Sequence, residues 1–132
     1  MALVVDTNIL SYIFKQDTRA ALYLPHLRGH LLILSFMTVA ELDQWALARN
    51  WGTPRQQKMD AYLKRYLIQH STREIGRHWA AAMTSAQRQG RPIDIADAWI
   101  AATALHFAVP LLTHNADDFA GVNGLDIITE NN

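Results

Sequence analysis

The chain of 132 residues contains no cysteine, which excludes disulfides, thiolate zinc sites and cysteine nucleophiles and is compatible with a reducing compartment. It also carries no net charge, so a polyanionic partner would have to be held by a local basic patch. No uncharged apolar run is long enough to cross a bilayer, and Asp6 arrives too early for the apolar region of a signal peptide. We therefore expect a cytoplasmic protein that does not contact membranes.

Half of the residues are hydrophobic, and a chain of this length suits one domain, residues 1–132, with no internal repeat or linker. Short apolar runs predict strands at 2–5, 30–35, 109–113 and 124–129, with a weaker one near 68–71. Between these runs, apolar residues at helical spacing predict helices from residue 8 onward, at 17–27, 38–50, from 54 to about 67, at 72–89 and at 93–107. The alternation predicts an α/β fold of three layers with a mostly parallel central sheet flanked by helices.

Several helix starts carry recognisable signals. Asp17 or Thr18 can cap the second helix, and Thr38 followed by Glu41 has the spacing of a capping box. Pro54 suits the first turn of the next helix. These signals fix the expected helix boundaries.

Polar residues follow two of the predicted buried strands. Asp6, Thr7 and Asn8 come after "ALVV", and residues 113–118, "THNADD", come after "VPLL". In open parallel sheets the ligand crevice lies beyond the carboxyl ends of the strands. We therefore expect Asp6 to mark the edge of a functional site, although an Asp at this position can also simply cap the helix that follows.

Other acidic residues can likewise be interpreted either as helix caps or surface residues or as parts of a functional site. Glu41 fits the capping box, yet its apolar neighbours suggest that it faces protein. Asp97 is surrounded by apolar and alanine residues, with no basic residue within one helical turn, and ionised carboxylates are seldom buried without a partner. Asp94 shares a helical face with Asp97, but we interpret it as a cap. Asp117 and Asp118 are candidates only because they lie next to a strand end.

Convergence of these acids would be costly. Two like charges about 4 Å apart repel by roughly 4 kcal/mol at an effective dielectric near 20, and a domain is stable by only about 5–15 kcal/mol. A divalent cation, or protonation of some of the acids, would remove the penalty. Carboxylate ligands without cysteine or paired histidines favour Mg²⁺ or Mn²⁺ over zinc. Such a site suits phosphoryl transfer to water.

Four segments together make the sequence resemble the PIN-domain ribonucleases, specifically VapC-type toxins of VapBC toxin–antitoxin systems. They are "VVDTNIL", "SFMTVAEL", "DAWIAATAL" and "LLTHNADDF", and the likeness extends over essentially the whole chain. By this resemblance Asp6, Glu41 and Asp97 match the acidic metal-binding residues. For the fourth position we favour Asp118, with Asn115 as a polar site residue; Asn115 itself, or Asp117, is the alternative.

The resemblance implies an endoribonuclease that uses Mg²⁺ or Mn²⁺, cleaves structured RNA such as tRNA or rRNA loops, is silenced by a VapB-type antitoxin and forms homodimers. In this hypothesis Asp6 and Asp97 hold the ion, Glu41 and Asp118 complete the acidic shell or orient water, and four residues line the pocket: Thr7, Asn8, Ser35 and Asn115. The cations available for RNA phosphates are Arg49, Arg55, Lys58, Lys64, Arg65, Arg73, Arg77, Arg88 and Arg91. Trp45 and Trp51 can stack on a base or grip an antitoxin, although their helical spacing favours the core.

Two other functions fit parts of the pattern. An aspartyl-phosphate phosphatase also has a hydrophobic strand that ends in Asp, but it requires a second Asp where this chain has Asn8. An RNA-binding or interaction module would keep the fold and use its acidic crevice for a basic peptide. Metal-dependent cleavage distinguishes the nuclease from both.

Overall fold

A computed structural model describes residues 1–131 and places five strands in one sheet with the order β3-β2-β1-β4-β5. All four strand pairings are parallel, which confirms the predicted sheet, including its weaker strand. The strands are β1 (Ala2–Val5), β2 (Leu31–Ser35), β3 (Leu67–Gln69), β4 (Leu111–Leu112) and β5 (Ile127–Ile128).

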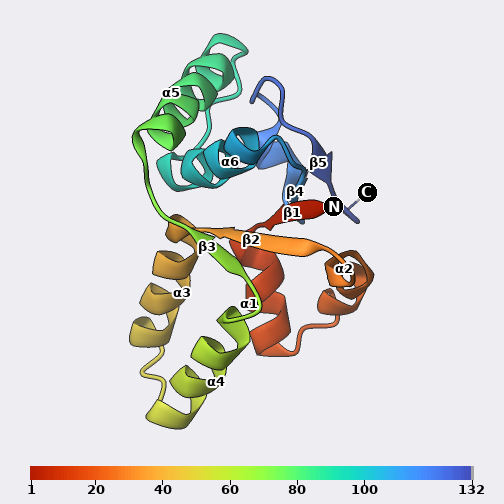
Figure 1. The fold of residues 1–132 in the computed structure, drawn as a ribbon, viewed down its shortest axis with the longest axis vertical. Helices are drawn as coiled ribbons and strands as arrows, with labels where there is room; N and C mark the ends of the chain where they lie inside the picture. The colour runs from red at the N-terminus through yellow and green to blue at the C-terminus, as the bar shows by residue number, and fades with distance from the viewer. Residues whose placement is uncertain (132) are drawn as a thin grey trace.

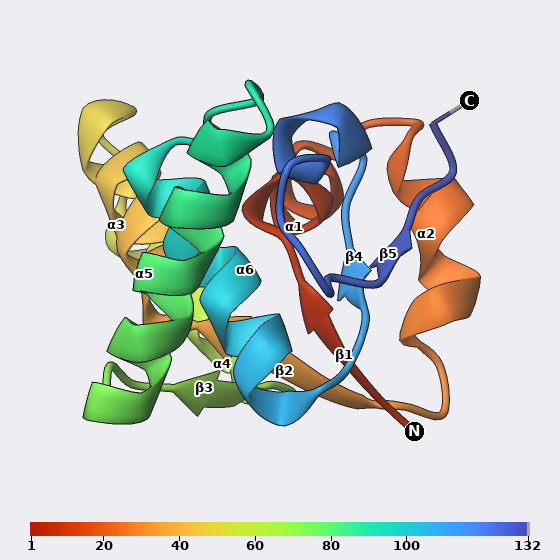
Figure 2. The ribbon, with the colours of Figure 1, turned by 90° about the horizontal axis from the view of Figure 1, so that it is seen from above.

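Helices cover both faces of this sheet, as the predicted three-layer α/β architecture requires (Figure 1, Figure 2). They are α1 (Thr7–Lys15), α2 (Ala20–Leu27), α3 (Phe36–Ala48), α4 (Thr53–Leu63), α5 (Arg73–Arg88) and α6 (Ile95–Phe107), followed by a short 3₁₀ helix, η1 (Ala116–Phe119). Helices α5 and α6 lie on one face, and α1, α3 and α4 lie on the other (Figure 1). Within residues 1–131, no helix combines the length and apolar character that a bilayer span requires.

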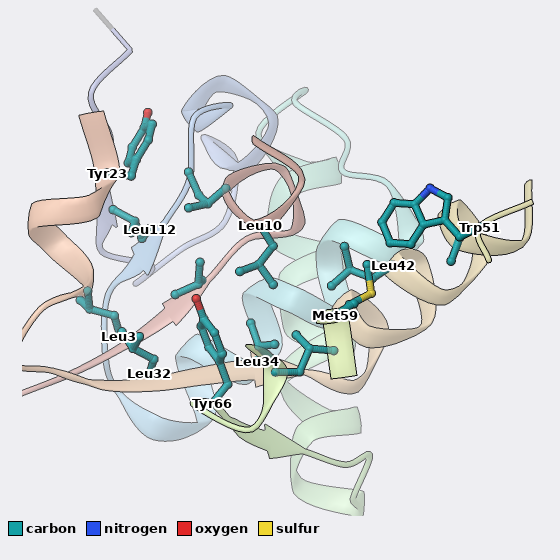
Figure 3. Close-up of a cluster of buried hydrophobic side chains, with 14 residues drawn as sticks. Leu3, Leu10, Tyr23, Leu32, Leu34, Leu42, Trp51, Met59, Tyr66 and Leu112 are labelled. Atoms are coloured by element: carbon teal, nitrogen blue, oxygen red, sulfur yellow. The ribbon is translucent and has the colours of Figure 1, made fainter. Parts of the chain in front are cut away.

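Successive residues of the central strand enter different cores because side chains alternate across a strand. Leu3 and Val5 of β1 join the cluster beneath α1 to α4, whereas Val4 joins the cluster beneath α5 and α6. Figure 3 shows the first cluster, in which Leu42 and Trp51 lie close to the α4 residue Met59. Burial on both faces explains why the strands read as continuous apolar runs.

Two predicted caps are wrong. Ser35, and not Thr38, caps α3, because β2 runs directly into the helix and the Ser35 hydroxyl accepts a hydrogen bond from the amide of Met37. Thr38 therefore lies inside the first turn of α3. The N-cap of α2 is Arg19, and Asp17 instead accepts bonds from the backbone and side chain of Arg19.

The strand order reverses beside β1. The chain leaves β1 for β2 and β3 on one side, and returns through α5 and α6 to place β4 and β5 on the other. A parallel sheet binds its ligands outside the carboxyl ends of the strands at such a reversal. The ends of β1 and β4, occupied by Asp6 and Thr113, are therefore where a site is expected.

Candidate active site at the carboxyl ends of β1 and β4

Asp6 has both of the roles considered from the sequence. It is the N-cap of α1, and its Oδ1 accepts a 2.8 Å hydrogen bond from the Thr7 amide. Its Oδ2 accepts a second bond, of 2.7 Å, from the hydroxyl of Thr113 at the end of β4. The side chain is only 5% exposed, so this carboxyl links two neighbouring strand ends in addition to capping a helix.

The electrostatic surroundings of Asp6 oppose its ionisation. Burial raises the pKa of this carboxyl from 3.8 to about 6, although the bonds from Thr113 and Thr7 stabilise the charged form. The nearby charges of Glu41 and Asp118 raise this pKa further. Three acidic side chains from distant parts of the sequence therefore act on each other at one place.

Asp97 lies in the first turn of α6 and is half-buried. Burial is the largest cause that raises the pKa of this carboxyl to about 7, followed by the charges of Asp6, Asp118, Glu41 and Asp94. These four charges are all negative. The interpretation of Asp94 as an N-cap agrees with its position, yet its side chain makes no capping bond and adds negative charge near Asp97.

Glu41 is held by a hydroxyl of another helix. Thr7 of α1 donates a 2.7 Å hydrogen bond to Glu41 Oε1, and its hydroxyl lies 3.0 Å from that of Thr38. This arrangement joins α1 to α3 and replaces the predicted capping box. Glu41 thus faces α1, the helix that begins at Asp6, rather than the backbone at the start of its own helix.

The loop after β4 is tied to the same strand ends. The hydroxyl of Thr113 accepts a 3.0 Å bond from the Asn115 amide, and the side chain of Asn8 lies 3.5 Å from both Thr113 Oγ1 and the His114 amide nitrogen. The ring of His114 is hydrogen-bonded to the buried Tyr23 hydroxyl at 2.6 Å, which gives this histidine a structural role.

The fourth acid is better represented by Asp118 than by Asp117. Both are exposed and line a pocket of about 570 Å³ together with Asn115. Only Asp118 is among the charges that raise the pKa of Asp6 and of Asp97. Asp118 is therefore the residue of η1 whose charge acts on the other acids.

The predicted pocket residues differ in their surroundings. Thr7, Asn8 and Asn115 bond to the acids or to Thr113, as described above. Ser35 is fully buried, and its hydroxyl caps α3. Two residues of this region were not among the site residues predicted from the sequence. The hydroxyl of Thr113 contacts Asp6, and that of Thr38 contacts Thr7. The position of Thr113 directly after a buried strand is a signal that could have identified it. Thr38 was instead interpreted as a helix cap, so it was not considered as a site residue.

The donor chemistry of this site fits a hard divalent cation. Within residues 1–131, no three acidic or histidine side chains form a ready-made metal cluster. Mg²⁺, however, is commonly held by one or two carboxylates, with water and substrate phosphates as its other ligands. Asp6 and Asp97 supply two carboxylates whose pKa values are raised first by burial and then by negatively charged neighbours, and a bound cation would offset both effects.

Comparison with known proteins agrees with this fold and arrangement. A family model for the PIN domain matches residues 3–125, so the chain belongs to the PIN-domain family. Within that family it belongs with the VapC ribonucleases: it is 30% identical over 130 residues to Ribonuclease VapC1 of Haemophilus influenzae (strain R2866), and the match covers 95% of each chain.

Two solved structures support the assignment at different levels. VapBC-1 from nontypeable Haemophilus influenzae has a TM-score of 0.82 and 28% identity, with 98% of each chain covered. VapBC2 from Rickettsia felis, solved bound to a DNA fragment from its promoter, has a TM-score of 0.85 with 98% of each chain covered. Its identity is 21%, so this second likeness concerns the fold alone.

Proposed function

We propose that this protein is a divalent-metal-dependent endoribonuclease toxin that cleaves structured RNA, with tRNA or rRNA loops as its targets. The observation that carries the proposal is the convergence of four acidic residues, Asp6, Glu41, Asp97 and Asp118, at the point where the strand order reverses. Kinship with the VapC ribonucleases supports the same activity.

In this proposal Asp6 and Asp97 hold Mg²⁺ or Mn²⁺. When bound, the ion supplies an activated water and neutralises charge on the scissile phosphate. The hydroxyl of Thr113 and the amide of Thr7 fix the orientation of Asp6, which keeps the carboxylate in place without substrate. Glu41 and Asp118 complete the acidic shell or orient water. Thr7, Asn8 and Asn115 shape the pocket, whereas the fully buried Ser35 acts only by capping α3, the helix that carries Glu41.

The proposal includes two protein partners. A VapB-type antitoxin would neutralise the enzyme, and a second copy of the chain would form a homodimer. The similar VapBC-1 structure from Haemophilus influenzae supports the first of these. Negative charge concentrated at Asp6 and Asp97 is complementary to a basic segment of such an inhibitor.

The test is cleavage of purified tRNA by the purified protein in Mg²⁺, with EDTA as the metal-free control. Asp97→Asn is expected to lower the cleavage rate by about a hundredfold or more, because it removes one of the two carboxylates proposed to hold the ion. Asp60→Asn, at an exposed position on α4, is the matched control and is expected to cleave within about twofold of the wild type. Full activity in Asp97→Asn, or undiminished cleavage in EDTA, would contradict the proposal.

A further inference from the structure

A second charged surface lies at the other end of α1. A groove of about 850 Å³ separates the C-terminal part of α1 from α4, which are neighbours on the same face of the sheet (Figure 1). All four charged residues that line it are cations: Lys15, Arg55, Lys58 and Arg65. Phe14 and Tyr62 add aromatic surface. We refer to this feature as the basic groove.

The two arginines of the basic groove are held in place by aromatic rings, and all four cations remain available to a ligand. The Arg55 guanidinium lies 4.1 Å from the ring centroid of the buried Trp51, and that of Arg65 lies 5.0 Å from the ring of Tyr62. Such stacking occupies the flat face of a guanidinium and leaves its N–H groups free to donate. All four cations are exposed, and within residues 1–131 none of them forms an ion pair.

Three of the cations form a row. Arg55, Lys58 and Arg65, with Tyr62 between them, follow the spacing of three, seven and ten residues that keeps side chains on one face of a helix. From Arg55 to Tyr62 the row extends for about 10 Å along α4, and Arg65 lies just beyond the end of the helix. A regular row of positive charge beside aromatic rings is the arrangement that tracks a nucleic-acid backbone.

The basic groove and the acidic site share one helix. Asp6 caps the start of α1, and Lys15 is its last residue, so the two ends are about 12 Å apart along the helix axis. An RNA strand whose scissile phosphate lies at Asp6 can therefore reach the groove with phosphates only a few nucleotides away. This proximity favours RNA over an acidic peptide, which would have no need to approach the acidic site.

We propose that the basic groove binds the phosphate backbone of a single-stranded RNA segment that flanks the cleaved bond. This inference rests on the proposed ribonuclease function and adds where the substrate is held. The Trp residues considered for base stacking are assigned a different role, because Trp51 is buried beneath Arg55 and Trp45 packs on Trp51 with a centroid distance of 4.9 Å.

The experiment measures binding of a fluorescein-labelled oligouridylate with 2′-O-methyl groups, which cannot be cleaved by attack of its own 2′-hydroxyl, in EDTA to prevent hydrolysis. The triple variant Arg55→Gln/Lys58→Gln/Arg65→Gln is expected to bind at least about tenfold more weakly than the wild type. The slope of log affinity against log salt should fall in magnitude by about 2, because each phosphate contact on a single strand contributes about 0.7. Lys58→Gln alone, which removes a cation that is stacked on no ring, should reproduce about a third of the slope change.

The matched control is Arg73→Gln/Arg77→Gln/Arg88→Gln, which removes three exposed cations of α5 and changes the net charge by the same amount. Binding by this control is expected to stay close to that of the wild type. An equal loss in the two triple variants, or no loss in the groove variant, would overturn the proposal. Polyglutamate that displaces the RNA at equal charge concentration would also overturn it, in favour of an acidic protein partner.

Binding and cleavage are measured separately so that the two proposals fail in different ways. If the wild type binds the oligonucleotide through the groove but never cleaves RNA, the proposed ribonuclease function fails and the groove proposal stands as RNA binding. If the wild type cleaves tRNA and the groove variant binds and cleaves normally, the groove proposal alone fails. Thermal melting of each variant checks that the fold is retained.

Discussion

At the N-terminal end of α1, Asp6 is buried and accepts hydrogen bonds from Thr7 and Thr113. The negative charges of Glu41, Asp97 and Asp118 belong to the same cluster. At the C-terminal end of the same helix, Lys15 is exposed and borders a groove whose charged residues are all positive. Both charges agree with the helix dipole, which favours anions at the N-terminus and cations at the C-terminus. Apart from this agreement, the charged residues at the two ends of α1 are in different physical environments.

The difference lies in solvation. Water screens the cations of the basic groove, so placing four of them together costs little. The acids are partly removed from water and repel each other, which is why the pKa values of Asp6 and Asp97 are raised to about 6 and about 7. Solvated cations can therefore lie close together without a ligand at little cost in folding free energy. Buried carboxylates that lie close together are stable only when they bind protons or a cation.

The largest expected effect is a kinetic difference between variants of the acidic site and variants of the basic groove. Asp6→Asn should lower kcat for tRNA cleavage by about a hundredfold or more, because Asp6 is proposed to hold the ion that acts on the reacting phosphate. The Arg55→Gln/Lys58→Gln/Arg65→Gln variant should raise KM and leave kcat within about twofold, because its cations bind flanking RNA equally in the ground and transition states. Steady-state kinetics over a range of tRNA concentrations measures both. A matching fall in kcat for the two variants would break the distinction between a catalytic and a binding end.

The next effect is a dependence of stability on pH in EDTA. The pKa values of Asp6 and Asp97 are higher in the folded protein than the ordinary value of 3.8, so the folded state binds protons more tightly. Stability from this source is fully present below about pH 4 and is lost as the pH rises through about 6 to 7, with about 3 kcal/mol of the loss due to Asp6 alone. Urea unfolding at a series of pH values measures the loss.

Asp97→Asn sharpens this test. Removing one charge of the cluster should make the variant more stable than the wild type at pH 8 in EDTA and should flatten the pH dependence. Lys58→Gln, at the solvated end, should change the free energy of unfolding by less than about 0.5 kcal/mol at either pH. An Asp97→Asn variant that is less stable than the wild type at pH 8 would mean that the carboxylate is already neutralised.

A smaller effect is expected from Thr113→Val. This change removes the 2.7 Å bond to Asp6 and leaves the Asn115 amide without its hydroxyl acceptor, so the variant should lose about 1.5–3 kcal/mol of stability at pH 8. The pKa of Asp6 should rise, because the hydroxyl stabilises the ionised form. Thr113→Ser keeps the hydroxyl and is the control. Equal stability of the Val and Ser variants in urea unfolding would remove Thr113 from the site.

The sequence predicts the acidic end better than the basic one, for a physical reason. Asp6 stands out because a carboxylate ends a buried strand, and Asp97 stands out because a charge lies among apolar residues of one helix. Each of these signals is local in the chain. The order of the strands then brings the residues together, because the carboxyl ends of parallel strands share one edge of the sheet.

Contacts between distant segments could not be predicted in this way. The bond from Thr113 to Asp6 joins residues 107 positions apart and depends on the register of β4 against β1. Ser35 and Thr38 are both good cap residues, so only the point where β2 ends decides between them. The basic groove forms because α4 packs beside α1 in the folded protein. Nothing in the sequence indicates that these four cations lie on one surface.

The most direct measurement of the central claim is thermal melting at pH 8 before and after MgCl₂ is added to metal-free protein. The melting temperature of the wild type should rise with Mg²⁺, because a ligand of the folded state stabilises it. The Asp6→Asn/Asp97→Asn variant should melt at a higher temperature than the wild type in EDTA and should show no rise with Mg²⁺. A double variant that melts lower than the wild type in EDTA, and still responds fully to Mg²⁺, would contradict an acidic site that needs a cation.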